Sequence, residues 1–343
     1  IGDESDSLIF MGDYIDKGPR SRQTVEFVKS LTERFSDHVT AIMGNHELEL
    51  LKDRREYRYW YYHQLPYATV HPEEYLNFIN KPDDTDKLVI DALYNATLDV
   101  YGYNLYDSVQ FAPLATGQGR LAIVDIIKPQ SLRQLVSKRL NMYQKSYINA
   151  FRSGTELGKW VENRPIAHLG HDGTLYVHGG ISDAVAKQLT RGRNDVDELN
   201  EKFHMNATED RLIDFLDTVE GGIVEELIFY RGNHEPGACT ALDKMIAMMD
   251  GVERIAVGHT PEDYVRMLCG GRFLALDSAL GRWFRASGNM YCRGEKEEIS
   301  SNGKFVCEKK NNNCEGQIVK LGDGEKVEIL EALAVQDDVV TEL

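Results

Sequence analysis

Four short clusters in the sequence combine glycine with side chains that bind metal ions or phosphate. They are Gly-Asp-Tyr-Ile-Asp-Lys-Gly at 12–18, Gly-Asn-His-Glu at 44–47, His-Gly-Gly at 178–180 and Gly-His-Thr at 258–260. Glycine lets the backbone turn sharply and lets a cation or a phosphate approach closely. Carboxylate and amide oxygens combined with imidazole nitrogens suit manganese, iron, zinc or cobalt better than calcium. The clusters therefore predict a transition-metal site.

Each cluster follows a short apolar run that has the length of a buried strand. The runs cover residues 7–11, 39–43, 174–177 and 254–257, and a further run covers 272–276. Runs of four or five apolar residues bounded by turn residues predict buried strands. Open α/β sheets bind their ligands just beyond the carboxyl ends of such strands. A single cluster would be typical of an ordinary turn, but four in order predict one shared site.

The segments between these runs predict helices. Apolar residues recur at helical spacing over 25–35, so a right-handed crossover would make the first two strands parallel. Residues 48–164 predict a helical insertion or cap, and residues 183–226 predict a second one. Within 285–343, two alternating runs around a Gly-Asp-Gly turn predict strands paired as a hairpin. We expect a single domain over residues 1–343 that carries both insertions.

The composition excludes several classes of partner. The chain has 343 residues, 55 acidic and 39 basic side chains, and a net charge of −16. Binding to nucleic acid or to an anionic membrane requires a surplus of basic side chains, so we expect neither partner. No apolar stretch approaches the length of a membrane-spanning helix. We expect a soluble protein whose compartment is open, with the cytoplasm favoured, and we expect Cys239 and Cys269 to be buried thiols.

The ordered clusters resemble the calcineurin-like metallophosphoesterases, in particular the phosphoprotein phosphatase branch. The blocks of that family include Gly-Asp-x-Val-Asp-Arg-Gly, Gly-Asn-His-Glu, His-Gly-Gly and a final Gly-His. Gly-Lys-Trp-Val-Glu-Asn-Arg-Pro at 158–165 and Gly-His-Thr-Pro at 258–261 look like the Shewanella-like protein phosphatases. The resemblance covers residues 7–282. It implies an α/β metallophosphoesterase fold, with two facing mixed β-sheets flanked by helices and a helical cap insertion.

The resemblance implies a pair of metal ions held in part by Asp13, Asn45, His178 and His259. The carboxylate of Asp13 would bridge two divalent ions, which would be manganese, iron or zinc. The other three side chains would complete one of the two sites. Two cations close together polarise a phosphoryl group and lower the pKa of a shared water, which provides a metal-bound hydroxide at neutral pH.

The resemblance also implies roles for the residues that handle protons and phosphate. His46 would be the general acid for the leaving group, and the carboxylate of Asp16 would orient it and keep it protonated. Lys17 and Arg231 would hold phosphate oxygens. Lysine at position 17 replaces the usual arginine of the family, so phosphate would be held by a point charge rather than by a bidentate fork.

One block of the family is missing. A Gly-Asp-x-His-Gly block should precede Asp13 by somewhat under thirty residues, but only twelve residues precede it. His168 and His171 are alternative ligands, although we favour a turn at this point. The simplest explanation is an N-terminal truncation, which would leave one metal site incomplete.

The resemblance predicts a metal-dependent phosphomonoester hydrolase. The expected substrates are phosphoserine, phosphothreonine or phosphotyrosine in phosphoproteins. One alternative is a hydrolase of diadenosine tetraphosphate or of another small phosphate ester. The other is a truncated, catalytically impaired member that binds phosphate or a partner without turnover.

Overall fold

The computed structural model describes most of the chain between Ser7 and Asp277 and four strands beyond it. The described residues are 7–16, 20–54, 70, 72–101, 124–261, 265–277, 297–299, 305–307, 316–321 and 327–332. Within them, no helix is both long enough and apolar enough to cross a membrane.

The first strand-helix-strand unit has the predicted arrangement. Strands β1 (Leu8–Phe10) and β2 (Val39–Ala41) pair in parallel, with Leu8 opposite Val39. Helix α1 (Ser21–Arg34) connects them and buries Val25 and Val28. The chain leaves both strands at the same edge, so residues that follow β1 and β2 lie close together.

The larger sheet is mixed and has five strands, in the order β3-β4-β5-β7-β6. Its central strands β4, β5 and β7 are parallel, whereas β3 and β6 pair antiparallel at the two edges. The strands are β3 (Ala167–Leu169), β4 (Thr174–Val177), β5 (Arg254–Val257), β6 (Arg266–Leu268) and β7 (Phe273–Ala275). Helices flank this mixed sheet, so the predicted α/β class is confirmed.

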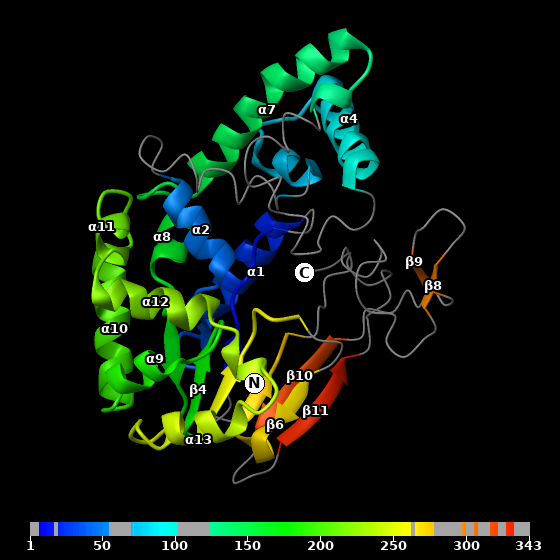
Figure 1. Cartoon of the computed structure of the whole chain (residues 1–343). Coiled ribbons are helices and arrows are strands. Elements are labelled where there is room, and N and C mark those ends of the chain that lie inside the picture. Colours follow the sequence, from blue (N-terminus) through cyan, green and yellow to red (C-terminus); the bar gives the residue numbers. More distant parts are fainter. Residues whose placement is uncertain are drawn as a thin grey trace.

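The described residues of both predicted insertions are mainly helical (Figure 1). The first holds α2 (Asn45–Asp53), η2 (Pro72–Phe78), α4 (Asp84–Tyr101), α7 (Gln130–Ala150) and α8 (Glu156–Glu162). The second holds α9 (Asp183–Gln188), α10 (Arg193–Asn206), α11 (Leu212–Leu216) and α12 (Val219–Phe229). Figure 1 shows α4 and α7 extending at the top of the molecule, away from the sheet strands. The division of the chain into one domain with two insertions stays a prediction.

The elements after α12 include the predicted C-terminal hairpin. They begin with η4 (Gly232–His234), α13 (Cys239–Ile246) and η5 (Cys269–Gly271). Strands β8 (Glu297–Ile299) and β9 (Phe305–Cys307) pair antiparallel. Strands β10 (Gly316–Leu321) and β11 (Val327–Ala332) also pair antiparallel, as the alternating runs predicted.

A buried carboxylate ties the first insertion to α1. Helix α1 has no side-chain cap of its own, but Glu74 of η2 accepts hydrogen bonds from the backbone N–H groups of Ser21 and Arg22, both at 2.9 Å. Two N–H groups that lack partners inside the helix are thereby satisfied. Glu74 has no exposed surface, and burial raises its pKa to about 7.

The prediction that Cys239 and Cys269 are buried thiols is wrong. The two residues form a disulfide that joins the start of α13 to η5, with their Cα atoms 5.1 Å apart. Cys239 is exposed and Cys269 is half-buried. The disulfide closes a loop that contains β5 and His259, and it therefore restrains the segment on which this histidine lies.

Candidate metal centre

The backbone after β1 turns through glycine into the site. Gly12 has a φ of 91°, and a Cβ atom placed there would lie 2.7 Å from both the Cα atom of Gly44 and the Nδ1 atom of His178. A side chain at Gly12 would therefore separate the turn after β1 from the turn after β2. Glycine at this position lets the first three clusters approach one another.

The structure brings four predicted metal-binding side chains together. One ligand atom each from Asp13, His178 and His259 lies within 4.8 Å of the others. The Oδ1 atom of Asn45 lies 2.7 Å from the Nδ1 atom of His259 and 3.1 Å from the Nε2 atom of His178. Carboxylate and amide oxygens therefore converge with two imidazole nitrogens, a donor set that fits a divalent first-row transition metal.

A hydrogen bond orients the ring of His178. Its Nδ1 atom lies 2.5 Å from the carbonyl oxygen of Met11, so Nδ1–H donates and the lone pair of Nε2 faces Asp13. Such a bond from the second ring nitrogen is usual for histidines that bind metals. Burial of His178 lowers its pKa, but the Asp13 carboxylate, the hydrogen bond to Met11 and the Glu47 carboxylate together raise it more, so the net shift is upward.

His259 is kept neutral by its surroundings. Burial, followed by the nearby His178 and Arg231, lowers its pKa to about 2. A neutral imidazole keeps the lone pair that a metal ion requires. The ring also packs edge-on against Phe229, with 6.1 Å between the ring centres.

Backbone strain is concentrated at this site. Five described residues other than glycine have a positive φ, and Asp13, Asp16 and His259 are three of them, at 60°, 70° and 64°. Each such conformation costs about 1–3 kcal/mol and persists only where its surroundings hold it. The surrounding fold therefore stabilises an unfavourable backbone conformation at the residues whose side chains form the site.

Glu47 holds the strained loop in place, a role that the sequence analysis did not assign. Its Oε2 atom accepts the backbone N–H groups of Asp13 (2.9 Å) and Gly44 (3.0 Å). Its Oε1 atom accepts those of Tyr14 (2.7 Å) and Ile15 (3.2 Å). Glu47 is completely buried, and burial followed by the Asp13 charge raises its pKa to about 7. The Gly-x-x-Glu spacing at the start of α2 is that of a capping box, and this pattern could have predicted that the Glu47 side chain binds backbone N–H groups.

His46 and Asp16 form a close pair beside the metal-binding side chains. The Nδ1 atom of His46 lies 2.6 Å from the Oδ2 atom of Asp16, and its Nε2 atom lies 3.9 Å from the Oδ2 atom of Asp13. The hydroxyl of Tyr147, on helix α7, donates to Asp16 at 3.4 Å. The backbone N–H of Asp16 donates to the hydroxyl of Ser21 at 3.0 Å. Tyr147 therefore links the first insertion to this pair.

The two predicted phosphate-binding residues have different outcomes. Arg231 follows α12 at the exposed rim of the site. Its pKa is lowered by partial burial, against the opposing effect of Asp13. Lys17 lies outside the described residues. Of the two predicted phosphate-binding cations, the described part of the chain therefore places Arg231 near Asp13.

Three further histidines and Asn233 were candidates for the site or lie next to its loops in the sequence. The Asn233 side chain accepts a hydrogen bond from the N–H of Ile181 and donates one to its carbonyl, which fixes the loop after β4. His234 packs edge-on against Phe273, with ring centres 5.0 Å apart. His168 lies in β3, outside the expected turn, and His171 is exposed within the turn. The metal-binding cluster found among the described residues includes none of these histidines.

One comparison with known protein families covers the N-terminal part of this site. Residues 2–116 match the calcineurin-like phosphoesterase family. A symmetrical bis(5'-nucleosyl)-tetraphosphatase from Marinomonas sp. (strain MWYL1) is 44% identical over 48 residues, which are 14% of this chain and 16% of that protein.

Two solved structures are also similar. The cold-active protein-tyrosine phosphatase of a psychrophile Shewanella species is 20% identical, with a TM-score of 0.47 over 80% of this chain and 61% of that chain. A protein serine/threonine phosphatase from Saccharomyces cerevisiae is 13% identical, with a TM-score of 0.43 over 96% of this chain and 71% of that chain. This chain spans less than two thirds of the tetraphosphatase and of the tyrosine phosphatase. The match of residues 2–116 to the calcineurin-like phosphoesterase family covers about a third of the chain and includes Asp13 and Asn45, and the fold adds His178 and His259 to them.

Proposed function

We propose that the protein is a metal-dependent phosphomonoester hydrolase that acts on phosphoserine, phosphothreonine or phosphotyrosine in proteins. The observation that carries this proposal is the convergence of oxygen and nitrogen donors beside the His46–Asp16 pair. Metal-binding donors next to an oriented imidazole are what hydrolysis of a phosphate ester requires.

Asp13, Asn45, His178 and His259 are the side chains that would hold a divalent ion. Such ions neutralise the charge of a phosphoryl group and make water a better nucleophile. The backbone N–H of His46 donates to the Oδ1 atom of Asp13 at 3.2 Å, and this bond fixes the carboxylate. The Oδ2 atom is left on the side of the His46 ring, 3.9 Å from Nε2, where a second ion could share it. The donor chemistry favours manganese, iron or zinc.

His46 is the proposed general acid. Its Nδ1–H donates to the buried carboxylate of Asp16, so the second proton of the imidazolium is carried by Nε2, on the side of Asp13. Nε2–H would give this proton to the oxygen of the leaving group, and Asp16 would stabilise the imidazolium beforehand. Arg231 would hold phosphate oxygens from the rim, and Lys17 would do so from the loop after Asp16.

Substrate class is the open part of the proposal, because one relative is a tetraphosphatase. The test compares hydrolysis of a panel of phosphopeptides with hydrolysis of diadenosine tetraphosphate, at equal manganese concentration, with Asp13→Asn as the inactive control. Faster hydrolysis of the phosphopeptides supports the proposal. A clear preference for the nucleotide would assign the protein to the small-molecule alternative. Binding of phosphate without any turnover would identify an impaired member.

We further infer that the protein matures in an oxidising compartment. Disulfides persist mainly in oxidising surroundings and are rare in the cytosol. The Cys239–Cys269 bond supports this location over the cytoplasm that the sequence favoured. Peptide mapping of protein isolated from its cells without reductant tests the inference, which fails if the two cysteines are recovered as free thiols.

A further inference from the structure

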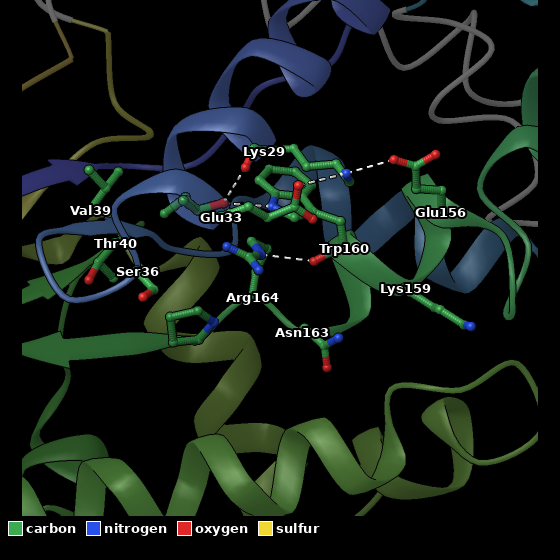
Figure 2. A pocket seen from close by; sticks show the side chains of 13 residues that line it. Lys29, Glu33, Ser36, Val39, Thr40, Glu156, Lys159, Trp160, Asn163 and Arg164 are labelled. Atoms are coloured by element: carbon green, nitrogen blue, oxygen red, sulfur yellow. Dashed lines mark hydrogen bonds and ion pairs between the residues drawn. The ribbon is translucent and has the colours of Figure 1, made fainter.

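A pocket separate from the metal-binding side chains lies between α1, β2 and α8. Its volume is about 460 Å³, within the range of sites that bind small molecules. No proposed metal-binding or catalytic residue lines it. Figure 2 shows Arg164 and Trp160 inside this pocket, with Lys29 and Glu33 of α1 on one side and Asn163 on the other.

The guanidinium of Arg164 is fixed in the pocket. It lies over the indole ring of Trp160, 4.4 Å from the ring centre, and its Nε–H donates to the carbonyl of Trp160 at 2.8 Å. The indole N–H of Trp160 in turn donates to the hydroxyl of Thr32 at 3.0 Å. Stacking and these two bonds define the plane of the guanidinium.

The two terminal nitrogens of this guanidinium donate no hydrogen bond to any residue that the structure describes. Among the described residues, the only hydrogen bond of the Arg164 side chain is the one from Nε to Trp160. Burial lowers the pKa of Arg164 to about 10, against the opposing effects of Tyr14 and Glu33. A guanidinium that has lost water without gaining an anion is destabilised. A bound oxyanion would offset this cost, because it can accept two parallel N–H bonds from the fork.

The other charged side chains that line the pocket are those of Lys29, Glu33, Glu156 and Lys159. The ammonium of Lys29 bonds to Glu33 at 2.9 Å and to Glu156 at 2.7 Å, so these three side chains neutralise one another in part. Lys159 is exposed and forms no ion pair within the described part of the chain. Arg164 and Lys159 are therefore the cations that an incoming anion can reach.

We propose that this pocket binds an oxyanion group, a phosphate or a carboxylate, through the terminal nitrogens of Arg164 and the ammonium of Lys159. Ser36 and Thr40 supply hydroxyl donors, and Asn163 supplies an amide. The pocket is larger than a bare ion, so the group belongs to a small molecule. The proposal does not depend on the activity proposed above.

Isothermal titration calorimetry of the metal-free full chain tests this proposal, with inorganic phosphate and citrate as the two probes. Arg164→Gln should weaken binding of the preferred probe by about 10-fold or more, and Lys159→Gln by about 3-fold or more, since each removes a charged donor. Lys138→Gln, an equally exposed lysine on α7, is the matched control and should change nothing. Arg231→Gln, at the rim of the proposed active site, should leave this binding intact.

The comparison of variants decides the outcome. Lys159 is exposed, so its variant reports on binding even if Arg164→Gln lowers the melting temperature. Citrate in preference to phosphate would identify a carboxylate ligand, and the reverse would identify a phosphate ligand. The proposal is overturned if neither probe binds, if Lys159→Gln binds like the unmodified chain, or if Arg231→Gln alone abolishes binding.

Discussion

Glu47→Gln tests whether a buried carboxylate holds the metal-binding loop. Each oxygen of Glu47 accepts two backbone N–H groups, and three of the four donors belong to Asp13, Tyr14 and Ile15. Glutamine has the same shape, but its NH₂ group would face two of these donors in either orientation. Two hydrogen bonds to a charged acceptor would therefore be lost, and two buried N–H groups would be left without a partner.

The expected loss of stability is modest, because two effects oppose each other. Two hydrogen bonds to a charged group contribute about 3–6 kcal/mol to the free energy of unfolding. Against this, glutamine does not bury a charge. The rise of the Glu47 pKa from 4.5 to about 7 corresponds to a cost of about 3 kcal/mol for keeping the buried carboxylate ionised. The free energy of unfolding should thus fall by about 0–3 kcal/mol. Metal affinity should fall more clearly, by about 10–100-fold, as it does when groups that orient a ligand are changed.

The assay is a competition titration of zinc against a coloured chelator, with a thermal melt of each protein. Glu49→Gln is the matched control, because Glu49 is also buried in α2 but bonds to Lys52 and not to the loop. We expect normal zinc affinity in the control. Unchanged zinc affinity in a folded Glu47→Gln protein would refute the argument that Glu47 positions Asp13.

Three further predictions concern proton transfer, the disulfide and pH. His46→Asn should lower the phosphatase rate by about 100-fold or more without changing the metal content, because it removes the general acid; loss of metal would instead make His46 a ligand. Replacing Cys239 and Cys269 by serine should lower the free energy of unfolding by about 3–4 kcal/mol, because a loop of about thirty residues is no longer closed; equal denaturation midpoints would contradict this. Burial raises the Glu74 pKa from 4.5 to about 7, so the folded protein retains a proton that the unfolded chain has lost. The free energy of unfolding should therefore decrease as pH rises from 4.5 to 7, by up to about 3 kcal/mol for this group. Glu74→Gln should reduce that decrease, and an identical pH profile in the variant would show that Glu74 does not cause it.

The positions of the proposed ligands could be predicted because each lies directly after an apolar run. Asp13, His178 and His259 follow β1, β4 and β5 by one to three residues, and Asn45 begins the helix after β2. Within each sheet the carboxyl ends of parallel strands meet at one edge, so local spacing places Asp13 near Asn45 and His178 near His259. The approach of the two sheets, which local spacing does not predict, brings the two pairs together.

Other parts of the structure depend on contacts between distant segments. Tyr147 donates a hydrogen bond to Asp16 from a position 131 residues away in the sequence, and no local sequence pattern predicts that bond. The Cys239–Cys269 pair is separated by 30 residues and has no sequence signature. The edge strands β3 and β6 have only three residues each, too few for a periodic pattern.

The central claim is that Asp13, Asn45, His178 and His259 hold one divalent ion. Anomalous diffraction from crystals of the zinc-loaded chain tests it most directly. We predict a zinc peak about 2.0–2.2 Å from an oxygen or nitrogen atom of each of these side chains. A zinc peak that contacts none of them, or the absence of any peak after loading with excess zinc, would contradict the claim.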